Sequence, residues 1–246
     1  MLDKKYFLVG LLFFKYFILL RTIPDLETTR YITFFEQCVN LKSCINPYSN
    51  IDLLEKQYLT FPYSNFMYFV LLPSYFIANF FNFSFVNLSY LFFEILLIFI
   101  LRKLFNISFR NLYLILVLNP VVIYSIGILG QLDFIPLTFF MVSLYYLKNK
   151  EKYYSIFFLI LSLTTKIVFL ILLPIVVLYF LKIDQTREEN RNTIFYTLIV
   201  GTLFNFQLLI DKAYSKTVFF GVNRGYDVVS DSSNLFSNNL LFIMLF

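Results

Sequence analysis

Histidine is absent from the 246 residues of the chain, which removes the side chain that most often acts as a general base near neutral pH. The same absence removes the commonest metal ligand, and the two cysteines are too few to build a zinc site alone. A Ser-His-Asp catalytic set is excluded as well. Acid–base chemistry in this chain therefore falls to Asp, Glu, Lys or Tyr side chains.

Charge is scarce too: Asp, Glu, Lys and Arg make up 14% of the residues, whereas 59% are hydrophobic and 22% are aromatic. Soluble domains carry about 25% charged residues and about 45–50% apolar ones. A single hydrophobic core is too small to bury this excess of apolar side chains, so the composition predicts a polytopic membrane protein. In that class a net charge of +5 reflects cytoplasmic Lys and Arg, and we expect no nucleic-acid partner.

Several sequence motifs are also missing. The chain has no phosphate-binding Walker loop, no dinucleotide glycine fingerprint, no internal repeat and no low-complexity linker. The sequence therefore offers no recognised nucleotide site and no boundary between domains. We expect one all-α transmembrane domain over 1–246.

Apolar runs recur along the chain and predict a bundle of about eight or nine membrane segments, each helical because lipid cannot satisfy backbone polar groups. The runs lie at 6–20, 66–82, 84–101, 111–129, 132–147, 153–165, 167–181 and 194–210. No small-residue cleavage site follows the first run, so we expect it to be a retained span. A last run, 240–246, is too short to cross, and we expect a C-terminally truncated chain that stops inside a helix.

Lys and Arg in short loops predict the orientation, because such residues gather on the cytoplasmic side. They form four clusters: Lys4 and Lys5; Arg102, Lys103 and Arg110; Lys148, Lys150 and Lys152; Lys182, Arg187 and Arg191. All four share one side if the segment 66–82, which contains Pro73, is re-entrant or interfacial. If that segment crosses fully, the loop at 102–110 lies outside. We favour the first arrangement.

Three polar segments then face the outside: the large loop 21–65, expected to contain interfacial helices, the tip 130–133, and a second loop at 211–238. Connections inside compact proteins are usually much shorter than 21–65, which favours a functional role for this loop. Cys38 and Cys44 lie in it, and their spacing is compatible with a local disulfide and with two free thiols.

Asp25 is the first candidate for chemistry, because it follows the first apolar run directly and opens the large outer loop. A carboxylate at a membrane boundary is partly desolvated, which raises its pKa and suits it to act as a base. Asp133 is the second candidate, placed by two flanking spans at the same outer boundary. Together they could position an acceptor hydroxyl or bind a divalent cation. The alternatives are a solvated loop charge for Asp25 and an ordinary polar turn for Asp133.

Two basic residues expected on the same outer side are further candidates for the site. Lys166 stands at the tip between two apolar runs, where it either snorkels to water or meets a phosphate. Arg224 lies in the second outer loop, as a phosphate clamp or a solvated arginine. Lys15 and Glu94 stand inside apolar runs, and we expect them to pair with each other or with lipid headgroups in a structural role.

A family resemblance rests on short motifs in this order. An acid follows the first span, then come Asn-Pro-Tyr-Ser at 46–49 and Phe-Pro-Tyr-Ser at 61–64, and later Asn-Pro at 119–120 and Gly-Gln-Leu-Asp at 130–133. This pattern resembles the GT-C superfamily of membrane glycosyltransferases. The similarity is clearest over residues 20–182, and the stretch from 119 to 174 is similar to its polyprenol-phosphate-mannose-dependent branch and to the mannosyltransferases of glycolipid anchors.

The resemblance implies an enzyme that takes a sugar, mannose in this branch, from a polyprenyl-phosphate carrier and gives it to a glycan or lipid acceptor on the non-cytoplasmic face. It implies that Asp25 and Asp133 are the catalytic acids. Substrate-binding residues drawn from the same polar segments are Glu27, Arg30, Tyr63, Gln131, Lys166 and Arg224. No cofactor is required, although the two acids permit Mg²⁺ or Mn²⁺. The expected location is a bacterial inner membrane, or the endoplasmic reticulum membrane of a eukaryote.

Two other functions remain open. A lipid-linked saccharide flippase or a small-solute transporter would use Lys15 and Glu94 near the middle of the membrane. An inactive fragment of a glycosyltransferase is the other alternative, because full members of the superfamily continue through further spans.

Overall fold

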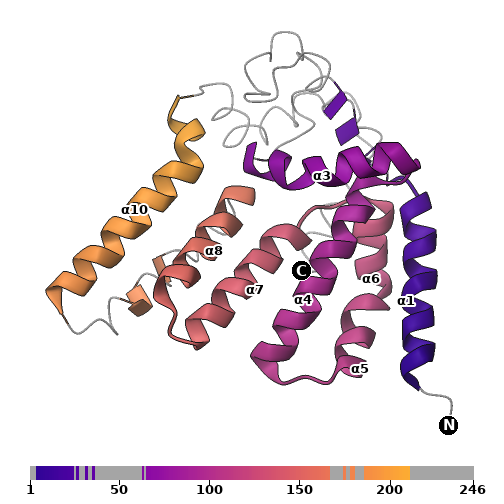
Figure 1. The fold of residues 1–246 in the computed structure, drawn as a ribbon, viewed down its shortest axis with the longest axis horizontal. Helices are drawn as coiled ribbons and strands as arrows, with labels where there is room; N and C mark the ends of the chain where they lie inside the picture. The colour runs from indigo at the N-terminus through magenta and orange to yellow at the C-terminus, as the bar shows by residue number, and fades with distance from the viewer. Residues whose placement is uncertain are drawn as a thin grey trace, which may run out of the picture.

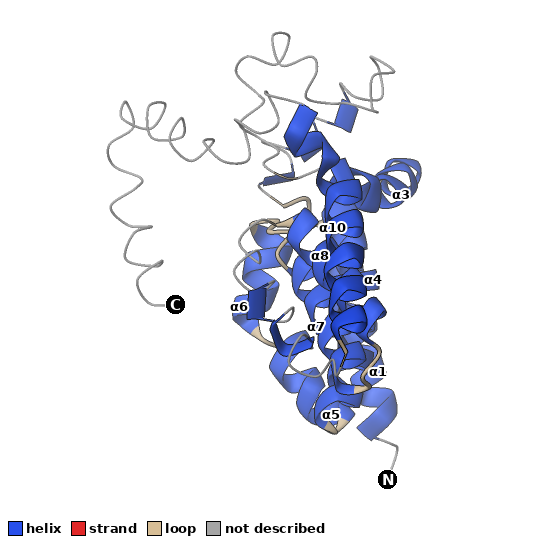
Figure 2. Cartoon of the chain, turned by 90° about the vertical axis from the view of Figure 1, so that its left-hand side faces the viewer, coloured by secondary structure: helices blue, strands red, loops and turns tan. Residues whose placement is uncertain are grey.

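The computed structural model contains helices and loops and no strand among the residues it describes, which confirms the all-α expectation. The described residues are 4–24, 26–27, 31–32, 35–36, 63, 65–166, 174–175, 178–180 and 186–210. Long helices lie side by side in one layer, in the order α10, α8, α7, α4 and α1 (Figure 1). Viewed along that layer, α6 is displaced to one side and α3 to the other (Figure 2).

The helices match most of the predicted apolar runs. Their bounds are α1 Lys4–Arg21, α3 Asn65–Phe81, α4 Phe85–Phe105, α5 Phe109–Leu112, α6 Pro120–Val122, α7 Phe134–Lys148, α8 Lys152–Thr165 and α10 Arg187–Ile210. Two π-helical segments, η4 Tyr113–Val117 and η5 Ile123–Ile128, continue α5 and α6. The apolar run 194–210 belongs to α10, which begins seven residues before the run and includes polar residues there.

Helix α4 has the features of a membrane span. Ser84 caps its start by accepting a hydrogen bond from the backbone N–H of Asn87, and Asn106 ends it in the left-handed conformation, at φ 53°. Its 21 residues extend about 32 Å, close to the thickness of a bilayer core. Among the described residues, α4 is the one unbroken helix that is long and apolar enough to cross a membrane.

The run 111–129 was expected to be one continuous helix, and this is wrong. The structure divides it into 109–117 and 120–128, which meet at an angle of 45°. Pro120 has no N–H to donate and disfavours a helical conformation at the residue before it. Asn119 is accordingly extended, and its side chain accepts a hydrogen bond from the N–H of Val121 to cap the second half. Taken together, the two halves are long and apolar enough for one bent span.

Most of the described Lys and Arg residues, apart from Lys15, Arg21 and Lys166, lie at one end of the layer of helices. Lys148, at the end of α7, donates a hydrogen bond of 2.7 Å to the backbone oxygen of Leu104, at the end of α4. Helices α1, α8 and α10 begin on this same side of the layer, which we call the basic end (Figure 1). Ring contacts and hydrogen bonds fix the direction of α10: Tyr196 packs on Tyr153 near the start of α8, and Asn205 bonds to Thr164 near its finish. The described parts of all four predicted basic clusters therefore lie at one end.

Helix α3 is oriented differently from the layer. It lies across the opposite end of the bundle and is seen almost end-on when the molecule is turned (Figures 1 and 2). Its buried face carries Met67, Tyr68, Leu71, Tyr75 and Ala78, which pack into the largest core cluster. The ring of Phe35 stacks on those of Tyr68 and Tyr75, with centroids 4.8 and 5.0 Å away, so aromatic packing holds α3 against the bundle.

Candidate functional site

The opposite end of the bundle, which we call the Asp133 end, gathers polar side chains from several elements. Asp133 lies just before α7 and Lys166 just after α8, and the ammonium of Lys166 forms an ion pair with Oδ1 of Asp133. The two side chains are 51% and 36% exposed, so the pair is open to solvent. The α7–α8 hairpin therefore brings these two predicted site residues together.

Tyr63 lies beside this pair. Its ring meets that of Tyr31 edge-on with centroids 6.4 Å apart, and it hydrogen-bonds to the backbone at Leu132. Burial raises the pKa of the Tyr63 hydroxyl well above its ordinary value, and the nearby Tyr31 and Asp133 raise it further. The hydroxyl therefore stays protonated and can act as a hydrogen-bond partner but not as a base.

Asp25, Arg30 and Arg224 lie outside the described residues, as do Cys38 and Cys44. Residues on both sides of Asp25 are described, however. The backbone N–H of Leu26 donates a hydrogen bond of 3.1 Å to the carbonyl of Leu129, and Pro24 lies against Gly130. The described residues Pro24 and Leu26 therefore pack on the turn that leads to Asp133, and Gln131 is exposed on that turn.

Glu27 has a role that the sequence did not indicate. Only 1% of it is exposed, and its carboxylate accepts hydrogen bonds from the Ser84 hydroxyl and from the backbone N–H groups of Phe85 and Val86. The two backbone N–H groups belong to the first residues of α4 and would otherwise be unsatisfied. Glu27 thus caps α4 from outside, and the positive end of the helix dipole favours its charge. Its predicted contact with substrate stays a prediction.

Burial and hydrogen bonding shift the pKa of Glu27 in opposite directions. Loss of water raises the pKa of the carboxyl to about 7, although the bonds from Ser84, Val86 and Phe85 oppose the rise. The Ser84 hydroxyl can donate to the ionised carboxylate or accept from the protonated acid, so both forms keep this contact. The group therefore titrates near neutral pH inside the fold.

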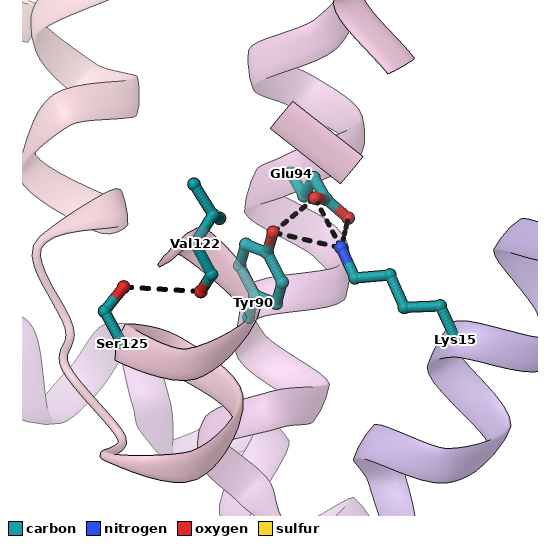
Figure 3. A network of polar contacts seen from close by, with 5 residues as sticks. All are labelled: Lys15, Tyr90, Glu94, Val122 and Ser125. Carbon is teal, nitrogen blue, oxygen red and sulfur yellow. Dashed lines mark hydrogen bonds and ion pairs between the residues drawn. The ribbon is translucent and has the colours of Figure 1, made fainter. Parts of the chain in front are cut away.

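A second polar group lies between α1 and α4. The Lys15 ammonium contacts the two carboxylate oxygens of Glu94 at 2.8 and 3.1 Å and the Tyr90 hydroxyl at 3.2 Å. The Tyr90 hydroxyl also donates to Glu94, so the three groups close a triangle (Figure 3). Nearby, Ser125 donates separately to the carbonyl of Val122. The expected pairing of Lys15 with Glu94 is thus confirmed.

The Lys15–Tyr90–Glu94 triangle is buried and electrically neutral. Lys15 is 7% exposed, Glu94 2% and Tyr90 2%, and Glu94 lies near the middle of α4. Charges at such a depth persist only when they are paired and hydrogen-bonded, as these are. The arrangement joins α1 to α4.

Asn87 ties three elements together at the Asp133 end. It is fully buried, and its amide nitrogen donates to the carbonyls of Leu19 at 2.8 Å, Thr22 at 2.9 Å and Gly127 at 3.4 Å. These carbonyls belong to α1, the turn after it, and η5. An Asn inside an apolar run was the available signal for this role, because such an amide needs partners.

Among the described residues, no group of three or more Cys, Asp or Glu side chains is arranged to hold a metal ion. No family model, curated protein or solved structure matches the chain.

Proposed function

We propose that the chain is a multi-pass membrane protein, with α1, α4, the bent pair 109–128, α7, α8 and α10 as its membrane segments. The gathering of basic residues at one end supports this, because Lys and Arg concentrate on the cytoplasmic side of membrane proteins. The apolar side chains exposed along the layer also support it; they include Phe92, Phe99 and Leu198. In water such surfaces would be unfavourable, whereas acyl chains match them.

We further propose that this membrane protein is a glycosyltransferase, which transfers a sugar from a polyprenyl-phosphate carrier to a glycan or lipid acceptor at the Asp133 end. The ion pair between Lys166 and Asp133 is the observation that carries the proposal. Lys166 has three N–H donors and remains partly exposed, so it can bind a phosphate while Asp133 holds it in place. Mannose is the proposed sugar, and a bacterial inner membrane is the proposed location, with the endoplasmic reticulum as the eukaryotic equivalent.

The proposed reaction is a single inverting displacement. Asp25 accepts the proton of the acceptor hydroxyl as its oxygen attacks the anomeric carbon of the sugar. The bond from that carbon to the phosphate oxygen breaks, and the polyprenyl phosphate leaves with the electron pair. Lys166 stabilises the charge that develops on the leaving phosphate, and the Tyr63 hydroxyl is close enough to Asp133 to help orient the pair.

Sugar transfer in membranes tests this proposal. With radiolabelled polyprenyl-phosphate mannose as donor, Lys166→Met should lower the rate at least about 100-fold, as loss of one electrostatic stabiliser typically does. Asp25→Asn should have a similar effect, whereas the exposed Lys150→Met at the basic end is the matched control for a lost cation. Full activity of Asp25→Asn would refute the base assignment, and full activity of Lys166→Met would refute the leaving-group role.

Transport is the second candidate, because the buried Lys15–Glu94 pair puts ionisable groups near the middle of α4. A transporter must break or protonate this pair during its cycle, while the proposed enzyme needs it only to hold α1 in place. Flux of a flipped saccharide lipid across vesicles, abolished by Lys15→Met together with Glu94→Leu, would favour transport. Sugar transfer that survives this double change would favour the enzyme.

A further inference from the structure

Helix α3 presents an aromatic stripe to the surroundings. Phe69, Pro73, Phe76 and Phe80 recur at the spacing of one helix face, and the exposed fractions of the three phenylalanines are 51%, 55% and 81%. The opposite face is buried in the core. All 17 residues of α3 are uncharged, so the stripe offers nothing that would pair with an acidic or basic partner surface.

Both ends of α3 are fixed at the level of the Asp133 end. At its start, the Phe66 ring contacts those of Phe139 in α7 and Phe204 in α10, at 5.9 and 5.6 Å. At its finish, the turn into α4 is held by Ser84, whose N–H donates to the Leu20 carbonyl at 2.8 Å and whose hydroxyl bonds to Glu27. The helix therefore runs across the bundle from α10 to α4 and cannot follow the direction of α4.

Exposed apolar side chains also occur at the finish of α3 and on α4, the helix that follows it in the chain. Phe92 and Ile95, on α4, are 54% and 40% exposed, and Phe81 at the finish of α3 is 56% exposed. In Figure 2, α3 projects beyond the layer of long helices on one side. A projecting, uncharged aromatic face beside an apolar span matches acyl chains much better than water, where each exposed ring is unfavourable by about 1.5–3 kcal/mol relative to burial.

We propose that α3 lies in the plane of the membrane, with the stripe Phe69–Phe76–Phe80 embedded among the acyl chains of the leaflet at the Asp133 end. This inference rests on the proposed membrane insertion but not on the glycosyltransferase activity. An in-plane α3 also places all the described basic clusters on one side of the bilayer. It anchors the Asp133–Lys166 pair at the depth where a lipid-borne phosphate would lie.

The chain contains no tryptophan, so a single introduced tryptophan reports its own depth without background. Phe69→Trp and Phe80→Trp are separated by 11 residues, which is about 16 Å along a helix axis. In phosphatidylcholine and phosphatidylglycerol vesicles, lipids brominated near the headgroup or deep in the chain quench according to depth. An in-plane α3 gives both tryptophans the same shallow quenching profile.

The control is Ile95→Trp at the midpoint of α4, on an exposed position, which should be quenched best by deeply brominated lipid. Unequal depths for positions 69 and 80 would show that α3 crosses the membrane and would overturn the proposal. Absence of quenching at both positions, with Ile95→Trp quenched, would mean that α3 does not contact lipid and would overturn it as well. Absence of quenching at Ile95→Trp would overturn the membrane proposal itself, whereas loss of sugar transfer bears only on the enzyme.

Discussion

Glu27 makes the fold sensitive to pH at a single residue. Its pKa is raised from an ordinary 4.5 to about 7, so between these values the folded chain binds a proton that the unfolded chain has lost. Stability must then fall as pH rises through that window, and it stays low above pH 7. A rise of the pKa from 4.5 to about 7 corresponds to about 3 kcal/mol of stability.

The midpoint of thermal unfolding in detergent should therefore fall by about 6–12 °C between pH 5 and pH 8. Glu27→Gln removes the titrating group and should flatten this dependence, although it lowers stability at every pH because an amide N–H then faces the N–H donors of α4. Glu36→Gln, at an exposed position, should retain the slope of the wild type. An equal slope in the Glu27→Gln and wild-type proteins would contradict this account.

Lys15 and Glu94 should show strong energetic coupling. Either Lys15→Met or Glu94→Leu alone leaves one buried charge without its partner, which costs about 3–5 kcal/mol. The double variant leaves no charge and should regain most of that loss, since apolar residues of similar volume often replace buried pairs without penalty. A double-mutant cycle on detergent-stable protein measures the coupling, and additive losses would exclude it.

At the scale of elements, three glycines should respond differently to alanine. Gly130 has φ 81°, and an added Cβ would lie 2.8 Å from that of Pro24, so Gly130→Ala should destabilise the turn before Asp133 by about 1–2 kcal/mol. Gly127→Ala meets only the flexible end of Leu19, at 2.4 Å, and should be milder. Gly201→Ala, in open space within α10, should stabilise by about 0.5–1 kcal/mol. The midpoints of thermal unfolding of the three variants measure this order. A Gly130→Ala variant as stable as the wild type would contradict the predicted steric strain at Gly130.

The elements also show which features of the fold the sequence could predict. Apolar runs located α1, α4, α7 and α8 because lipid-facing or buried helices are apolar throughout. The break at Pro120 was visible as a residue that cannot donate to a helix, yet run length alone suggested one span. The direction of α3 depends on which of its faces packs, and the sequence therefore left a crossing and an interfacial arrangement open.

The residues of the candidate site also differ in whether the sequence could predict their contacts. Asp133 and Lys166 could be placed together because a hairpin of two helices returns to the end of the bundle where it began. The capping role of Glu27 could not, because its partner Ser84 is 57 residues away and the contact depends on how α1 turns towards α4. Asn87 is similar, since it reaches Leu19 across 68 residues. Contacts between residues so far apart in the chain cannot be predicted from local sequence patterns.

At the scale of the whole molecule, the fold predicts which residues lie on opposite sides of the membrane. The described basic clusters and the Asp133–Lys166 pair lie at opposite ends, so one bilayer should separate them. In a background with Cys38→Ser and Cys44→Ser, a membrane-impermeant maleimide should label Gln131→Cys in intact cells. It should label Arg110→Cys and Asn149→Cys only after permeabilisation; all three positions are exposed in the fold.

The paired positions make this test informative about α3. Arg110 lies in α5, just after α4, and Asn149 ends α7, whose Lys148 bonds to Leu104 near the end of α4. The two positions are therefore at the same end and must label together whichever way the protein inserts. With the N-terminus inside, an in-plane α3 keeps both inside, whereas a crossing α3 would expose both and hide Gln131. Labelling of all three positions in intact cells would instead show that the layer of helices does not separate two compartments. That result would remove the basis for placing a lipid-linked donor at Lys166.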